Sequence, residues 1–155
     1  MNGAVLLERQ LICPLEADTA RVGGLLAKSL TAPAFIALFG GLGAGKTVFT
    51  RGFGEALGAA DVASPSFMIV REHDSEPRLL HFDAYRLSGA EELAAVGFDD
   101  YLRQRALIVL EWAERVPELL PPERLDIHIE GSGQEERRLR LVARGARYAE
   151  AVAAL

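Results

Sequence analysis

Apolar residues along this chain follow two kinds of pattern. Residues 34–39 and 107–110 are apolar at every position, which is typical of strands buried on both faces of a parallel sheet. Residues 17–30 and 48–57 instead carry apolar side chains at helical spacing. The first of these helices is predicted to face the core with Ala20, Leu25, Leu26 and Leu30. The second ends at Gly58, a plausible C-terminal cap.

Shorter segments complete the predicted sheet. Strand-like runs occupy residues 5–12, 68–72, 78–82, 125–130 and 137–142. The second and third resemble a hairpin, and the last two favour antiparallel pairing. A capping box of Ser88 and Glu91 predicts a short helix through residues 92–96, and residues 148–155 predict a small helix on the edge of the sheet. We therefore expect an α/β fold: a mixed sheet with parallel core strands, flanked by helices.

Length and composition indicate a single domain over residues 1–155. Half of the residues are hydrophobic and a quarter are charged, which suits one compact core. A formal net charge of −5 disfavours direct binding to DNA or RNA, so we expect any RNA connection to run through a partner. Cys13 is the only cysteine, which favours a reducing cytoplasm. Glu8 and Arg9 interrupt the first apolar stretch, so neither a signal peptide nor a membrane span is expected.

The loop between residues 34–39 and 48–57 fits the phosphate-binding motif G-x-x-x-x-G-K-[ST], known as Walker A, at every required position. Its residues are Gly40, Gly41, Leu42, Gly43, Ala44, Gly45, Lys46 and Thr47. The glycines allow backbone N–H groups to point inward around a phosphate. Lys46 adds positive charge beside the terminal phosphates, and the Thr47 hydroxyl can ligate Mg²⁺. A strand, this loop and then a helix form the required context, so we predict nucleotide binding on a P-loop NTPase-like fold.

Other positions in the sequence indicate which nucleotide is bound and which residues could hold the metal. An Asn-Lys-x-Asp element that reads guanine is absent, which favours ATP over GTP. A P-loop enzyme also needs an acidic group at the end of a neighbouring strand, and Glu111 and Asp83 compete for that role. We favour Glu111 for the metal because ligands bind beyond the carboxyl ends of central parallel strands. Asp83 would then orient water or sense the phosphate, although either carboxylate could instead cap a helix.

Residues 81–86 place a histidine, a carboxylate, a phenol and a guanidinium close together. Alternation puts His81, Asp83 and Tyr85 on one side. No second histidine lies near His81 in the sequence, so we interpret it as a hydrogen-bonding group rather than a metal ligand. Arg86 could contact a phosphate or pair with an acid.

The serine-proline turn and Trp112 each allow two interpretations. Ser64 and Ser66 flank Pro65 in a stiffened turn that could sense the terminal phosphate or serve only as a turn. Trp112 could cover an apolar surface or contact a partner, although core packing is the usual role of a lone tryptophan.

Ordered blocks along most of the chain resemble the TsaE (YjeE) family. They are residues 42–47, 64–67, 81–86 and 108–112. The resemblance implies a bacterial cytoplasmic ATPase that serves the synthesis of threonylcarbamoyladenosine in tRNA. Such a protein docks on the TsaD and TsaB proteins, and its ATP hydrolysis resets that complex between rounds of transfer. Contact with tRNA is then only indirect.

The resemblance also implies roles at matching positions. Gly43, Gly45, Lys46 and Thr47 hold ATP, and Thr47 and Glu111 hold Mg²⁺. Asp83, Arg86 and Trp112 belong to functional blocks, and so does the turn containing Ser66. We therefore predict Lys46, Asp83 and Glu111 as the catalytic set. Gly41 stands where the family commonly has an acidic residue, and Ser66 stands where it has a threonine but keeps the hydroxyl.

Two other functions compete with this one. A small P-loop kinase would need a lid carrying arginines, and Arg103 and Arg105 precede a buried strand rather than lie in a long loop. A nucleotide-sensing adaptor would bind ATP without turning it over.

Overall fold

The computed structural model describes residues 2–59, 62 and 69–155. The strands are β1 (Leu7–Cys13), β2 (Ala34–Phe39), β3 (Val70–His73), β4 (Leu79–Asp83), β5 (Leu107–Glu111), β6 (Arg124–Glu130) and β7 (Arg137–Arg144). The helices are α1 (Glu16–Ser29), α2 (Lys46–Ala56), α3 (Ala90–Ala95), α4 (Phe98–Leu102) and α5 (Ala146–Ala153), with 3₁₀ turns η1 (Ala113–Arg115) and η2 (Pro117–Leu119).

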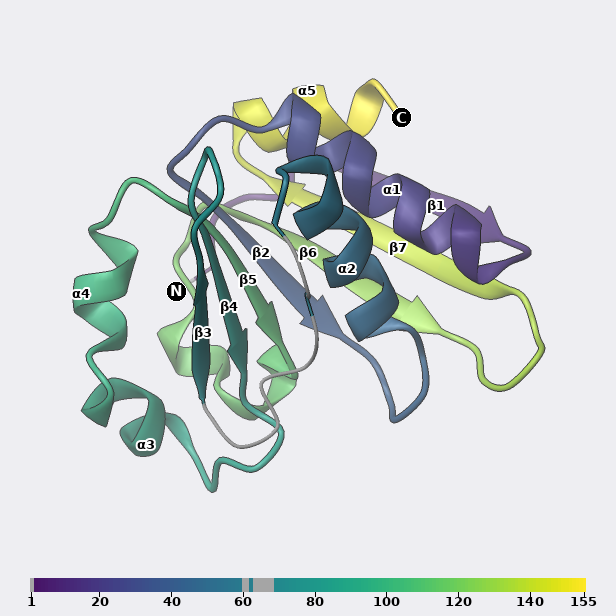
Figure 1. Ribbon diagram of the computed structural model, residues 1–155. Coiled ribbons are helices and arrows are strands. Elements are labelled where there is room, and N and C mark those ends of the chain that lie inside the picture. The colour runs from purple at the N-terminus through teal and green to yellow at the C-terminus, as the bar shows by residue number, and fades with distance from the viewer. Residues whose placement is uncertain (1, 60–61, 63–68) are drawn as a thin grey trace.

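The described strands form one sheet in the order β1-β7-β6-β2-β5-β4-β3 (Figure 1). Its centre is parallel: β2 pairs with β5 and with β6, and β4 pairs with β5. The pairs β1–β7, β6–β7 and β3–β4 are antiparallel. The predicted α/β fold with a mixed sheet and parallel core strands is therefore confirmed. Strand β5, which ends at Glu111, lies beside the strand that precedes the phosphate loop.

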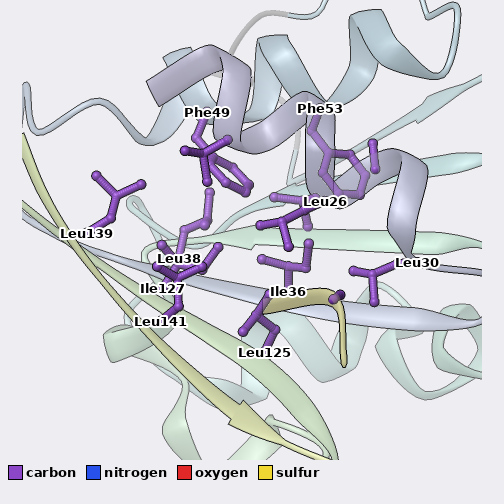
Figure 2. Close-up of a cluster of buried hydrophobic side chains, with 14 of the residues drawn as sticks. Leu26, Leu30, Ile36, Leu38, Phe49, Phe53, Leu125, Ile127, Leu139 and Leu141 are labelled. Carbon is purple, nitrogen blue, oxygen red and sulfur yellow. The ribbon is translucent and has the colours of Figure 1, made fainter. Parts of the chain in front are cut away.

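Helices α1, α2 and α5 cover one face of the sheet (Figure 1). Figure 2 shows Phe49 and Phe53 of α2 pointing toward Ile36 and Ile127 of the sheet, with Leu26 of α1 beside them. All five side chains are buried. Because each such side chain contributes about 1.5–3 kcal/mol when it leaves water, this cluster fixes α2 over β2.

The other face of the sheet packs against α3, α4, η1 and η2. Its core contains Phe35, Phe82 and Leu110 together with Phe98 of α4. The rings of Phe82 and Phe98 lie edge to face with centroids 5.2 Å apart. Both faces of β2 and β5 are thus covered, which explains why these strands are apolar at nearly every position.

Three details differ from the sequence prediction. Leu25 is 39% exposed, because Val22 and Leu26 define the buried stripe of α1 and Leu25 lies about 100° away from Leu26. Helix α3 begins at Ala90, and Ser88 bonds Glu92 rather than Glu91. Helix α5 packs on the face beside β7 and β1 rather than only on the edge.

None of the helices in the described ranges has the length and apolar character that a membrane span requires.

Candidate nucleotide-binding site

The phosphate loop connects the carboxyl end of β2 to the start of α2. Gly43 has φ +75° and Gly45, which precedes the helix, has φ +113°. These left-handed conformations favour glycine, and they produce the tight reversal between strand and helix. Helix α2 begins at Lys46, so its unpaired first N–H groups and positive dipole end lie at the loop, an arrangement suited to phosphate.

Lys46 is held inside this loop. Its Nζ donates to the carbonyl oxygens of Gly40 at 2.6 Å and Gly41 at 2.8 Å, and it lies 3.9 Å from the centroid of the Trp112 ring. Burial lowers the pKa of Lys46 from its ordinary value, and the nearby carboxylate of Glu114 partly offsets that effect. The ammonium group is therefore positioned at the loop and kept out of bulk water.

A cavity of about 660 Å³ opens beside the loop. The phosphate loop and α2 line one side with Leu42, Gly43, Gly45, Lys46, Thr47 and Val48. The start of α1 and the β6–β7 connection line another side with Pro14, Leu15, Glu16, Thr19, Gly133, Gln134, Glu135 and Arg137. Asp83, Tyr85 and Trp112 complete the lining. Its volume falls in the range typical of small-molecule sites.

Two carboxylates meet at the carboxyl ends of the parallel strands. Asp83 of β4 pairs in register with Glu111 of β5, and Glu111 pairs with Leu38 of β2. The Thr47 hydroxyl donates to Glu111 Oε1 at 3.2 Å, and Glu111 is only 2% exposed. The structure thus brings together the residue types that the sequence analysis assigned to the metal, from positions far apart in the chain.

These oxygen donors suit Mg²⁺. The hydroxyl of Thr47 and the carboxylate of Glu111 are hard ligands, and Mg²⁺ in nucleotide sites usually takes one or two protein ligands plus phosphate oxygens and water. Among the described residues, no group of three or more His, Cys, Asp and Glu side chains forms a complete metal cage. The donor set therefore fits Mg²⁺ that is bound together with nucleotide phosphates.

Trp112 adopts a left-handed backbone conformation with φ 60° and ψ 42°. It is the only non-glycine residue with positive φ in the described ranges, and such conformations concentrate at functional sites. The turn places its ring over Lys46 and against Tyr85, with ring centroids 4.7 Å apart. Trp112 is also partly buried against the hydrophobic core. It therefore combines the expected core packing with contacts at the phosphate loop.

Arg137 was missed by the sequence analysis. Its buried guanidinium donates to the carbonyl oxygens of Ala44 at 2.8 Å and Gly43 at 3.2 Å, and it also bonds Gly133 and Glu135 of the β6–β7 connection. It therefore ties the phosphate loop to this connection. The available signal was alternation: Arg137 occupies the same inward phase of its strand as Leu139 and Leu141.

Other predicted residues lie elsewhere. Gly40, Gly41 and Ala44 border a second hollow of about 560 Å³ behind the loop, where the N–H of Gly40 donates to Glu114 at 3.1 Å. Arg86 is exposed and does not line the larger cavity. Ser66 and the rest of the serine-proline turn lie outside the described residues.

Together, the fold and the loop define this chain as a P-loop NTPase-like α/β protein. A family model described as threonylcarbamoyl adenosine biosynthesis protein TsaE matches residues 13–139. The chain belongs to this TsaE family, whose members serve tRNA threonylcarbamoyladenosine biosynthesis.

Individual relatives agree with this assignment. The tRNA threonylcarbamoyladenosine biosynthesis protein TsaE of Bacillus subtilis is 38% identical over 143 residues, which cover 91% of this chain and 83% of the relative. The protein of the same name from Streptomyces coelicolor is 42% identical over 139 residues, which cover 84% of this chain and 93% of the relative. The crystal structure of YdiB from Bacillus subtilis is similar with a TM-score of 0.79 and 33% identity, over 96% of this chain and 93% of that one.

Proposed function

We propose that this chain binds ATP and has weak Mg²⁺-dependent ATPase activity, and that it acts on the TsaD–TsaB complex to support its turnover in tRNA threonylcarbamoyladenosine synthesis. One observation carries the proposal: the Thr47 hydroxyl meets the buried Glu111 carboxylate directly beside the phosphate loop. That pairing supplies hard oxygen donors where the terminal phosphates of a nucleotide would lie.

Each residue of the site has a chemical role in this proposal. The backbone N–H groups between Gly43 and Thr47 bind the phosphate oxygens, and Lys46 exchanges its bonds to Gly40 and Gly41 for the terminal phosphates. Thr47 and Glu111 hold Mg²⁺, directly or through water. When bound, the metal supplies neutralisation of the charge on the terminal phosphates.

Asp83 is the proposed group for the attacking water. It lines the cavity and lies one strand away from Glu111. One of its oxygens accepts the backbone N–H of Tyr85 at 2.9 Å, which fixes the orientation of the carboxylate. In this orientation Asp83 would accept a hydrogen from a water and direct a lone pair of that water toward the phosphate.

The partner assignment rests on the family and on charge. Family members serve tRNA threonylcarbamoyladenosine biosynthesis, and we propose that this chain does so in the cytoplasm by docking on TsaD and TsaB. Its net charge of −5 supports an indirect relation to tRNA, because phosphate backbones are bound by excess positive charge.

The kinase alternative receives no support from Arg103 and Arg105. Arg103 is exposed and pairs with Asp100 at 2.9 Å, and Arg105 is also exposed. Both residues precede β5, whereas the phosphate loop follows β2, which runs parallel to β5. They therefore lie at the end of the sheet opposite to the phosphate loop.

The test is ATP hydrolysis with Mg²⁺, measured for the chain alone and with purified TsaD, TsaB and tRNA. Stimulation by the partners, lost in Lys46→Ala, is the expected result. Tight ATP binding and demonstrated complex formation without stimulation would instead identify a nucleotide-sensing adaptor. Unchanged ATP affinity in Lys46→Ala would overturn the site itself.

Two further variants separate the proposed roles. Glu111→Ala is expected to weaken Mg²⁺-dependent turnover more than nucleotide binding, because the phosphate loop stays intact. Asp83→Ala is expected to spare ATP binding while impairing function in the complex. A large loss of ATP affinity in Asp83→Ala would place Asp83 in the primary nucleotide site rather than beside it.

A further inference from the structure

His81 lies beneath the candidate metal site. It belongs to β4, is fully buried, and places its Nε2 2.5 Å from Oε2 of Glu111 on the adjacent β5. It does not line the larger cavity. The contact therefore reaches the site through Glu111 alone.

The chemistry of the pair fixes its direction. An ionised carboxylate can only accept hydrogen bonds, so Nε2 carries the hydrogen and donates it to Glu111. The other ring nitrogen, Nδ1, has no partner among the described residues. In the neutral ring with its hydrogen on Nε2, Nδ1 carries a lone pair, so no buried N–H group is left without an acceptor. A bond of this kind to an ion is stronger than one between neutral groups.

Glu111 is consequently held at both oxygens. Thr47 donates to Oε1 and His81 binds Oε2. The terminal torsion of a glutamate is broad, so a carboxylate with one anchor rotates readily. The second anchor keeps Oε1 directed at Thr47 and the phosphate loop.

We propose that His81 is a positioning residue: it orients Glu111 so that Oε1 presents a fixed oxygen to a magnesium-bound nucleotide. This inference rests on the proposed Mg²⁺-dependent nucleotide binding and adds a residue that acts through Glu111. Groups that hydrogen-bond a metal ligand from behind typically change metal affinity or activity by about 10- to 100-fold when they are removed.

The experiment measures the affinity for a fluorescent ADP analogue with and without Mg²⁺. The ratio of the two affinities is the magnesium gain, and it requires no turnover. His81→Phe keeps the ring volume but removes the hydrogen bond. His81→Gln restores a donor near Nε2, whereas His81→Asn has a shorter amide that does not extend to Glu111.

The chain offers a matched control in His73. This second histidine is also buried, lies on the adjacent β3, and leaves its Nε2 without a partner among the described residues. No bond joins its side chain to Glu111 in the described part of the chain. His73→Phe is therefore expected to retain the full magnesium gain.

The expected result is a magnesium gain that falls by about 10- to 100-fold in His81→Phe, with the Mg²⁺-free affinity unchanged and the gain partly restored in His81→Gln. A full gain in His81→Phe overturns the inference, as does an equal loss of affinity with and without Mg²⁺. If His81→Phe fails to fold by circular dichroism, His81→Asn carries the same test. A wild-type chain without any magnesium gain would instead overturn the proposed function.

Discussion

Gly23 and Gly24, adjacent residues of α1, face the neighbouring helix α2 at very different distances. A Cβ atom on Gly23 would lie 2.3 Å from the carbonyl oxygen of Phe49, which real Cβ atoms essentially never approach so closely. A Cβ on Gly24 would meet the carbonyl oxygen of Gly52 at 3.5 Å and the Cβ of Ala56 at 3.7 Å, both ordinary contacts. Substitution by alanine therefore tests the packing of these two helices.

Two opposing contributions to the free energy of unfolding decide the effect of each alanine. Alanine in place of glycine within a helix gains roughly 0.5–1 kcal/mol, and Gly24→Ala is expected to keep that gain. Gly23→Ala must displace backbone by about 1 Å, from 2.3 Å to beyond the 3.4 Å of ordinary contact, and overpacking of this kind costs typically 1–3 kcal/mol. Because the helical gain is common to both variants, we expect their free energies of unfolding to differ by about 1–3 kcal/mol, the cost of the overpacking at Gly23.

Urea denaturation followed by circular dichroism measures this difference. The effect of losing a glycine on the unfolded chain is common to both variants, so their comparison isolates the contact in the folded state. Helix α2 also begins with Lys46 and Thr47, so Gly23→Ala is expected to weaken nucleotide binding as well. Equal stability of the two variants would refute the close approach of α1 and α2.

Three other predictions follow from single contacts. Arg137→Met removes the guanidinium from the carbonyl oxygens of the phosphate loop, so we expect the free energy of unfolding to fall by about 1–3 kcal/mol and the nucleotide affinity by roughly tenfold. Urea denaturation measures the first quantity and nucleotide titration the second. Unchanged values would contradict the reasoning. Because Trp112 is the only tryptophan and contacts Lys46, its fluorescence should change when nucleotide is added and Lys46 moves to the phosphates. Unchanged fluorescence during demonstrated nucleotide binding would count against that movement. Burial lowers the pKa of His73 from 6.5, so the unfolded chain binds the proton more readily than the folded chain. The free energy of unfolding should therefore fall as the pH drops below 6.5, by at most about 1.4 kcal/mol per pH unit. Urea denaturation at several pH values measures this dependence, which should be weaker in His73→Gln.

Segments with a strong local pattern were predicted closely. Residues 34–39 form β2 with the expected bounds, and residues 137–142 form part of the antiparallel β7. Predictions failed where one or two residues decided the outcome. Leu25 is apolar like Leu26 but lies off the buried stripe of α1, because hydrophobicity alone does not fix the angle at which a helix meets its sheet.

The candidate site divides in the same way. The phosphate loop was evident from sequence because its residues are contiguous, and Glu111 was inferred because it follows an apolar strand. The contacts of Arg137 with Gly43 and Ala44 span more than ninety positions. Alternation along the strand marks Arg137 as facing inward, but it does not identify the residues that its side chain contacts. The placement of Trp112 over Lys46 depends on a single left-handed residue, which no pattern indicated.

The sequence by itself determined the strand–loop–helix unit and the family, because the motif of residues 40–47 is contiguous and backbone conformation in short segments depends mainly on nearby residues. Only the tertiary structure decided which distant side chains meet at that loop. The parallel register of β4 and β5 beside β2 joins His81, Glu111 and Thr47. Such contacts follow from the order of strands in the sheet, which is set by burial of the whole core rather than by any one segment.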